Sequence, residues 1–481
     1  MISKSVFRLH FLCAFFALGT FVWGYNIGIL SSVLVHPDFR RTMGYPTASQ
    51  RGVITGMYYL GTWTSYVFIS TPASDRLGRR YAALLGITIM AVGTTFEAVA
   101  AGPGAYAMMV LGRIISGVGT GLVSTTVPTY QSEVAPAGKR GKYVVLNHMG
   151  LLVGLAAGFW VGYAATFWNL SAYGDISWRF SLGISLIPSF IFGAGLPFLP
   201  ETPRWLIEKN HHDQALRSLY WLREGSFTNE QIHYELSRIR SEAEEFKSLS
   251  SSWPTLFTDP NLFGRLWRAC VLLLMSRMCG ADMVSYYLPV LLRNLGLPTR
   301  SALMVGGIEG ILGIGAAGIE MLIIDRIGRR TTLVSGALTM AVALLLNGAL
   351  GQAYPGTTNR SADIICIAFI FVYKLGYSMS FGPAAWVYGS EIFPTAFRAR
   401  GLNFSASAGS IGSVVTTQIW PVGIEAIGSN IYFFFMAINL ACIPIILKFY
   451  PETKGVSLED MDALFASKPR QQEESPDRRI A

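Results

Sequence analysis

The stretch Asp75-Arg-Leu-Gly-Arg-Arg80 recurs as Asp325-Arg-Ile-Gly-Arg-Arg330, and each copy lies between long apolar segments. Two further pairs repeat at nearly the same offset. Pro-Glu-Thr-Pro-Arg at Pro200–Arg204 returns as Pro-Glu-Thr-Lys-Gly at Pro451–Gly455. The other repeated set is Glu133, Pro136, Arg140 and Gly141, which returns as Glu391, Pro394, Arg398 and Gly401. These matched pairs indicate an internal duplication, which in a membrane protein favours a transporter with its substrate site between the halves.

Composition places most of the chain in a membrane. Hydrophobic residues make up 51% of it and charged residues 14%, against roughly 25% charged in soluble domains. Apolar runs of about twenty residues, each long enough to span a bilayer, recur along the chain. Lipid offers backbone groups no hydrogen-bond partners, so these runs must be helices. We predict an all-α integral membrane protein with twelve transmembrane helices in two pseudo-symmetric six-helix bundles. The expected spans are residues 11–35, 52–71, 81–101, 104–128, 143–167, 179–199, 269–292, 303–324, 331–350, 363–389, 402–425 and 429–450.

The predicted organisation has four parts. An N-terminal six-helix bundle occupies residues 1–200 and a C-terminal six-helix bundle residues 269–455. Between them, residues 201–268 mix charged and apolar residues at helical spacing, which predicts a cytoplasmic linker of short amphipathic helices. Residues 456–481 form a cytoplasmic tail that ends in polar sequence.

The net charge of +9 is explained by topology rather than by nucleic-acid binding. If the N-terminus is cytoplasmic, most Lys and Arg residues fall on the inner side of the membrane. We therefore expect a multi-pass protein of the plasma membrane with both termini in the cytoplasm. Sequons at Asn169 and Asn359 fall in external loops and suggest glycosylation. The five cysteines show no metal-binding spacing, so no metal and no cofactor are expected.

Taken in order, the motifs resemble those of the sugar porter family of the major facilitator superfamily, most closely its fungal members. The resemblance covers roughly residues 10–460. It implies a carrier that works by alternating access, without enzymatic activity. Besides the repeated motifs, the residues that carry it are Gly24-Tyr25, Gly112-Arg113, Pro128, Tyr130, Trp178-Arg179, Tyr286-Tyr287, Gly382-Pro383 and Trp386.

Carboxylates and arginines cluster at the predicted cytoplasmic helix ends. Carboxylate–guanidinium pairs can be bidentate, and a lattice of them could hold the inner side closed until it breaks during transport. The alternative is a set of static surface pairs, each of little energetic value. The candidate coupling and gating residues are Arg113, Asp75, Arg79, Glu133, Arg140, Glu201, Arg204, Asp325, Arg329, Glu391, Arg398 and Glu452.

The predicted central site departs from the family pattern. The family uses Gln and Asn to recognise sugar hydroxyls. Here His148 replaces a Gln, Ser276 and Arg277 replace two more, and Asp282 replaces an Asn. The candidate substrate-binding residues are Asn26, His148, Ser276, Arg277, Asp282, Tyr377 and Trp386. An ordinary hexose is therefore a less favoured substrate than a sugar acid, polyol, glycoside or specialised metabolite.

Several roles stay open at this point. Arg277 and Asp282 could pair across the glycine break of the seventh helix, or Arg277 could meet an anionic substrate. His148 could contact substrate or simply pack. The family's proton symporters carry an Asp in helix 1 where this chain has Asn26, which resembles the facilitative members. Asp282 and His148 nevertheless leave proton coupling possible.

We therefore expect a membrane carrier of a sugar or sugar-like small molecule. The alternatives are a proton-coupled symporter or an exporter of a sugar acid or specialised metabolite, and, less favoured, a non-transporting nutrient sensor. The expected partners are the small-molecule substrate and the lipid bilayer, with no nucleic acid. The sequence does not predict the oligomeric state.

Overall fold

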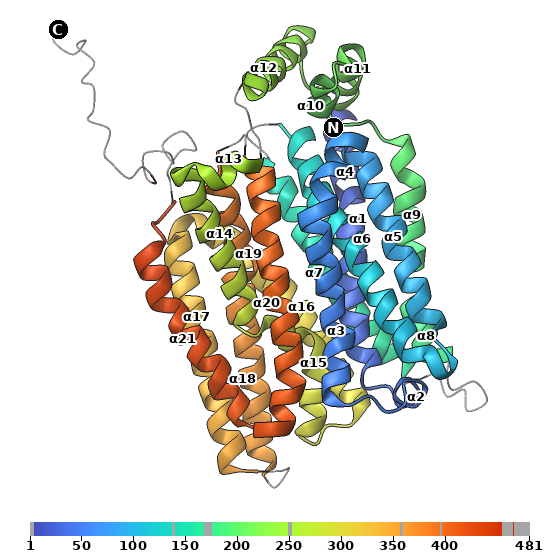
Figure 1. The fold of residues 1–481 in the computed structure, drawn as a ribbon, viewed down its shortest axis with the longest axis vertical. Helices are drawn as coiled ribbons and strands as arrows, with labels where there is room; N and C mark the ends of the chain where they lie inside the picture. The colour runs from blue at the N-terminus through green and yellow to red at the C-terminus, as the bar shows by residue number, and fades with distance from the viewer. Residues whose placement is uncertain are drawn as a thin grey trace, which may run out of the picture.

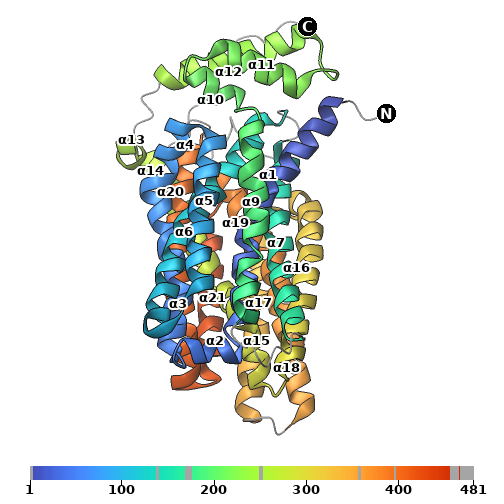
Figure 2. The same ribbon diagram turned by 90° about the vertical axis from the view of Figure 1, so that its right-hand side faces the viewer.

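The computed structural model describes residues 4–136, 140–167, 176–248, 253–355, 359–394, 397–454 and Phe465. Within these ranges the named regular elements are all helices, which confirms the all-α prediction. Two bundles stand side by side with their helices roughly parallel (Figure 1). The short helices that connect them in sequence lie across one end, as Figure 2 shows. We call this end the linker end and the opposite one the far end.

The first bundle contains the helices of the N-terminal half. Its second span is interrupted by one π-helical turn, η1, which separates α3 from α4. The elements are α1 (Lys4–Val33), α2 (Pro37–Thr42), α3 (Ala48–Thr64), η1 (Ser65–Ile69), α4 (Ser70–Leu77), α5 (Arg79–Val99), η2 (Gly102–Gly104), α6 (Ala105–Val134), α7 (Arg140–Ala165), α8 (Ile176–Gly183), α9 (Leu186–Gly195) and η4 (Leu196–Phe198).

The linker and the second bundle follow. The linker contains α10 (Pro203–Glu208), α11 (His212–Arg223), α12 (Asn229–Ser248) and α13 (Trp253–Thr258). The second bundle contains α14 (Pro260–Met278), α15 (Ala281–Asn294), α16 (Thr299–Ile327), α17 (Arg329–Ala353), α18 (Arg360–Ser378), α19 (Phe381–Glu391), α20 (Arg398–Ile427) and α21 (Asn430–Phe449).

Ten of the twelve predicted spans are helices long and apolar enough to cross a membrane, counted over the described residues. The other two are the run from α3 to α4 and the helix α20, whose sequences are rich in Gly, Ser and Thr. These two helices pack against each other where the bundles meet (Figure 1). Their lower apolarity fits this position, because a helix covered by protein faces little lipid.

A second junction between the halves is the packing of α7 against α16. Within the first half, α1 and α7 are in close contact, and Gly24 lies at that contact. A Cβ added at Gly24 would overlap the backbone carbonyl of Leu151. Gly24 is therefore required for the close approach of these two helices.

Candidate functional site

The predicted seventh span is broken in the middle of the membrane. Gly280, between α14 and α15, has φ of 103°, a left-handed conformation that favours glycine. The break frees the carbonyl of Cys279 from helical bonding. That carbonyl accepts hydrogen bonds from the Tyr373 hydroxyl at 2.9 Å and from the Asn439 amide at 3.1 Å. Two neighbouring helices thus hold the break in place.

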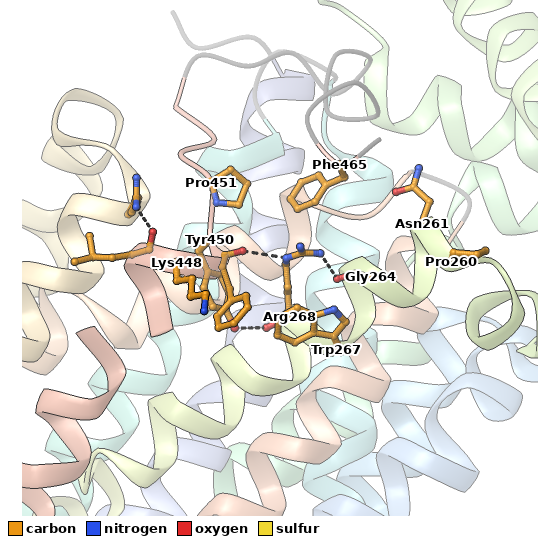
Figure 3. Close-up of a pocket in the computed structure, with 12 residues that line it drawn as sticks. Pro260, Asn261, Gly264, Trp267, Arg268, Lys448, Tyr450, Pro451 and Phe465 are labelled. Carbon is orange, nitrogen blue, oxygen red and sulfur yellow. Dashed lines mark hydrogen bonds between the residues drawn. The ribbon is translucent and has the colours of Figure 1, made fainter. Parts of the chain in front are cut away.

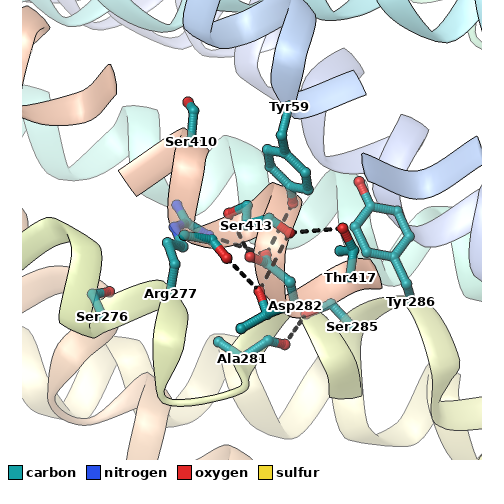
Figure 4. A network of polar contacts seen from close by, with 12 residues as sticks. Tyr59, Ser276, Arg277, Ala281, Asp282, Ser285, Tyr286, Ser410, Ser413 and Thr417 are labelled. Atoms are coloured by element: carbon teal, nitrogen blue, oxygen red, sulfur yellow. Dashed lines mark hydrogen bonds and ion pairs between the residues drawn. The ribbon is translucent and has the colours of Figure 1, made fainter. Parts of the chain in front are cut away.

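Arg277 and Asp282 lie on either side of this break and form an ion pair with an N–O distance of 3.3 Å (Figure 4). Asp282 is buried in the first turn of α15, where the helix dipole favours a carboxylate. It also accepts hydrogen bonds from the Tyr59 hydroxyl at 2.9 Å and the Ser413 hydroxyl at 2.5 Å. Because Tyr59 belongs to the first half, Asp282 connects the two halves.

A small cavity of about 20 Å³, with room for little more than a water molecule, lies between the halves beside this network. Arg277 supplies its positive charge, and Trp386 is the other predicted residue that lines it. The remaining lining is aromatic, hydroxyl-bearing or small: Trp23, Tyr59, Thr62, Tyr66, Leu273, Ala406, Gly409, Ser410 and Ser413. Aromatic faces and hydroxyls are groups that can bind a polyhydroxylated molecule, and the cavity in this conformation is too small to hold one.

The other five predicted binding residues are not among the residues that line this cavity. The hydroxyl of Ser276, the residue before Arg277, lies 3.4 Å from the Tyr377 hydroxyl. His148, on α7, is within electrostatic range of the Arg277 guanidinium. Asn26 is buried, and its amide donates to the Val22 carbonyl of its own helix at 3.1 Å. This bond ties the Asn26 side chain to its own helix rather than to the network around Arg277.

Contacts between the halves close the cavity toward the far end. The hydroxyls of Thr55 and Tyr287 are 2.8 Å apart, and the Tyr59 and Tyr286 rings make an edge contact with centroids 6.1 Å apart. At the far end, α3 is tied to α20 by an ion pair of 2.7 Å between Arg51 and Glu425. The structure therefore has a closed side made of tyrosines and one ion pair.

At the linker end, the duplicated motifs make duplicated contacts. In the first half, Arg79 binds Glu133 at 2.9 Å, and the Thr202 hydroxyl donates to the same carboxylate at 2.7 Å. In the second half, the matching bonds to Glu391 measure 2.8 Å from Arg329 and 2.9 Å from the Thr453 hydroxyl. Each set joins helices of one half, so these described pairs do not cross between the bundles.

Glu201 and Glu452 repeat a second pattern. Glu201 accepts from the backbone N–H of Arg80 at 3.1 Å, and Glu452 from that of Arg330 at 3.0 Å. Burial raises the pKa of the Glu201 carboxyl, while the N–H donors of Thr202 and Arg80 oppose that rise. Glu201 therefore fixes the N-terminal end of α5, and Glu452 fixes the N-terminal end of α17.

The rest of the predicted lattice is looser. Asp75 lies 3.9 Å from Arg79, Arg204 lies 3.5 Å from Glu208, and Arg398 donates to the Phe393 carbonyl at 3.4 Å. The side chains of Arg140 and Asp325 lie outside the described residues. Of the two predicted glycosylation sites, Asn169 also lies outside the described residues, and the Asn359 side chain caps the N-terminus of α18.

A buried ion pair that the sequence analysis did not identify links Glu97 on α5 to Arg113 on α6, with an N–O distance of 3.7 Å. Neither side chain is exposed. Ser116 donates to the Glu97 carboxylate at 2.7 Å, and Arg113 lies over the Tyr58 ring and 3.5 Å from the Tyr286 hydroxyl. The pair therefore reaches the tyrosines that close the cavity. The sequence signal was a lone acidic residue in an apolar helix.

A similar pair occurs in the second half. Lys374 on α18 lies 3.6 Å from Glu309 on α16 and donates to the Ser285 hydroxyl at 3.1 Å. Over the described residues, no group of three or more His, Cys, Asp or Glu side chains is arranged to hold a metal ion. Glu97 with Arg113 and Glu309 with Lys374 thus each bring one buried acidic and one buried basic side chain together.

Residues 12–465 match the family described as "Sugar (and other) transporter". The chain belongs to this family. A relative, the MFS-type transporter criB of Aspergillus cristatus, is 30% identical over 92% of this chain and 90% of its own length. A probable quinate permease of Aspergillus fumigatus is 27% identical over 96% and 88%. The glucose transporter GlcP of Staphylococcus epidermidis is 28% identical over 93% and 95%.

Solved structures share the fold. The inward open conformation of the xylose transporter XylE from E. coli matches with a TM-score of 0.78, covering 95% of this chain and all of that one at 23% identity. XylE bound to 6-bromo-6-deoxy-D-glucose, described as a proton:xylose symporter, matches with a TM-score of 0.77 over 95% and 99%. The predicted twelve-helix fold and the predicted family are therefore confirmed, and the chain is a multi-pass membrane carrier of the sugar transporter type.

Proposed function

We propose that this sugar transporter family member carries a polyhydroxylated small molecule that bears a carboxylate, a sugar acid in the broad sense. The observation that carries the proposal is the Arg277 guanidinium in the wall of the cavity between the halves. A guanidinium matches a carboxylate with two parallel hydrogen bonds. A relative named as a probable quinate permease supports the same class of substrate.

The neighbouring Asp282 explains how a cation is kept in this site without substrate. An isolated buried charge is costly, and the bond of 3.3 Å to Asp282 provides a partner. A substrate carboxylate would take over Arg277 and leave Asp282 with its two hydroxyl donors, Tyr59 and Ser413. Substrate binding would in this way change the surroundings of the hydrogen bond between Tyr59 and Asp282, which joins the two halves.

The rest of the substrate would be recognised by the cavity walls. Hydroxyls of Thr62 and Ser410 lie 2.9 Å apart on opposite halves, and each can both donate and accept. The indole rings of Trp23 and Trp386 offer apolar faces for the ring of the substrate. Because the groups come from both halves, a ligand here can respond to their movement, as alternating access requires.

Proton symport is our second candidate mechanism, and Asp282 is the observation that favours it. If substrate takes Arg277, a proton on Asp282 would keep the buried charge balanced, since one anion and one proton enter together. Uniport is the simpler alternative, because the helix-1 position holds Asn26, which does not titrate. Export rather than uptake is also compatible with this site.

We further propose that the linker end faces the cytoplasm, in the plasma membrane, because the basic motifs and the linker gather at that end. The predicted domain boundaries at residues 200, 268 and 455 belong to the same proposal. An enzyme or a non-transporting sensor is not proposed, since the relatives are named as transporters.

Uptake of labelled compounds into proteoliposomes tests the proposal. The panel contains a neutral hexose, a polyol, a hexuronate and quinate, each with and without an imposed proton gradient. We expect the two acids to be carried, and Arg277→Gln to abolish that uptake. Arg293→Gln is the matched control, because Arg293 is an exposed cation at the end of α15. Equal uptake of neutral hexose by the wild type and Arg277→Gln would overturn the substrate class.

A further inference from the structure

A second cavity opens at the linker end of the second half, where the ends of α14, α17 and α21 meet (Figure 3). It is open to the surroundings, has a volume of about 620 Å³, and shares no lining residue with the cavity between the halves. Its lining combines cations with aromatic rings: Pro260, Asn261, Gly264, Trp267, Arg268, Arg330, Leu447, Lys448, Phe449, Tyr450, Pro451 and Phe465.

The central cation, Arg268, is held firmly in place. Its Nε donates to the Phe449 carbonyl at 3.0 Å and its Nη1 to the Gly264 carbonyl at 2.6 Å. The guanidinium also lies 4.8 Å from the Trp267 ring and 5.5 Å from the Phe465 ring. A guanidinium has five N–H donors, so these two bonds fix its position and leave capacity for a ligand.

Arg330 and Lys448 add positive charge to the same cavity. Arg330 donates to the Leu447 carbonyl at its edge, and Lys448 is exposed at the end of α21. The lining residues that the structure describes contain no carboxylate. The neighbouring Glu452 accepts from the backbone N–H groups of Arg329 and Arg330 instead. The described lining of the cavity therefore carries a net positive charge, which is suited to an anion.

The outer rim of this cavity is apolar and exposed. Leu447 and Phe449 are 48% and 38% exposed and lie in the last turn of a membrane-spanning helix. Exposed apolar side chains in this position face lipid, and the cations next to them lie at the level of the headgroups. A ligand that fits both features is an amphiphile with an anionic head.

In the first half, a cation at the same end of the molecule is covered by other residues of the chain. At the linker end of α1, Arg8 lies 3.2 Å from Glu224 and donates to the Trp221 carbonyl, with its guanidinium 5.4 Å from the Trp221 ring. An anion and an aromatic ring from the linker thus cover this cation. Around Arg268, the aromatic rings are present, and the carboxylate at the start of α14, Asp259, accepts from the backbone N–H groups of Asn261 and Leu262.

We propose that the cavity around Arg268 binds the headgroup phosphate of an anionic phospholipid, with its acyl chains along Leu447 and Phe449. Basic pockets between membrane helices bind anionic headgroups through charge-assisted hydrogen bonds to phosphate. The site is independent of the proposed substrate, because it lies at the linker end and shares no lining residue with the cavity between the halves.

The test is native mass spectrometry of the purified full chain, titrated with phosphatidylglycerol or phosphatidylcholine. We expect phosphatidylglycerol to bind more tightly. Removing one cation should weaken its binding about fivefold, so Arg268→Gln with Lys448→Gln should weaken it by about 25-fold. Arg40→Gln, an exposed cation on α2 at the far end, is the control and should change nothing.

Three results would overturn the proposal. Equal affinity for the two lipids would remove the need for an anion. An unchanged affinity in Lys448→Gln, whose exposed side chain can be replaced without unfolding the chain, would exclude this cavity as the site. Competition by soluble glycerol phosphate at the concentration at which the lipid binds would show that the source of the phosphate is not a lipid.

Discussion

The hydroxyl of Tyr59 in the first half donates to the Asp282 carboxylate of the second half at 2.9 Å. The same carboxylate is bound by Arg277, which lines the central cavity. A group that draws Arg277 away therefore changes the surroundings of a bond that holds the two halves together. This relationship gives the cavity and the closed far side a direct physical connection.

Tyr59→Phe should weaken that connection without changing the packing of the ring. A hydrogen bond to a charged group contributes about 1.5–3 kcal/mol, so the variant should unfold at lower temperature in detergent. In a double-mutant cycle, Tyr59→Phe should cost much less when Asp282→Asn is already present. Tyr66→Phe is the control, because the Tyr66 hydroxyl binds Ser124 within its own half. Additive effects of the two substitutions would contradict the coupling.

The Glu97–Arg113 pair gives a second prediction. Both side chains are fully buried, so removing one charge leaves the other without its partner. Arg113→Met alone should lower the free energy of unfolding by about 3–5 kcal/mol. Adding Glu97→Leu to that variant should restore most of the loss, because no uncompensated charge remains. Thermal unfolding of the two variants in the same detergent measures the difference.

A transport measurement distinguishes a role of the Glu97–Arg113 pair in closing the cavity from a purely structural role. The double variant lacks the link from Arg113 to the Tyr286 hydroxyl, which measures 3.5 Å. If the pair matters for closing the cavity, the stable double variant should carry substrate several-fold more slowly than the wild type. A double variant with normal stability and normal transport would show that the pair only fills space.

Much of the fold follows from repeated patterns in the sequence. The motifs at Asp75 and Asp325 predicted two equivalent halves, and the bonds to Glu133 and Glu391 match almost atom for atom. Apolar runs predicted the spans because lipid permits few alternatives. The two spans of lower apolarity, α3 to α4 and α20, were also predicted from their apolar runs, at residues 52–71 and 402–425.

The site was less predictable, because its contacts join residues far apart in sequence. Arg277 and Asp282 stood out as charges near a glycine. Tyr59 and Ser413, which complete the same network, are ordinary residues in polar helices and gave no signal. Glu97 was visible as a lone acid, and only the packing of α5 on α6 shows that Arg113 is its partner.

Gly280→Ala tests the helix break. The residue has φ of 103°, and a Cβ there would lie 3.2 Å from both the Phe435 ring and the Tyr373 hydroxyl. Left-handed backbone costs a residue with a side chain roughly 1–2 kcal/mol, so the variant should be less stable. Gly315→Ala, in the middle of α16 with open space around it, should be neutral or slightly stabilising. Equal melting temperatures for the two variants would argue against a strained break.

The final prediction uses the internal duplication as its own control. Thr202 and Thr453 make the same bond, to Glu133 and Glu391, at 2.7 Å and 2.9 Å. The two carboxylates differ in exposure, since the side chain of Glu133 is 9% exposed and that of Glu391 is 22% exposed. Water can replace a lost partner more easily at the more exposed site.

Thr202→Val should therefore lower the melting temperature more than Thr453→Val, although the two substitutions are chemically identical. Both variants remove one hydroxyl and introduce the same branched side chain. The difference between their melting temperatures in one detergent therefore reports the difference between the two sites. A larger loss at Thr453 would mean that exposure does not set the strength of these bonds. In that case the two halves would differ in how firmly their helix ends are tied, and the second half would depend more on this contact.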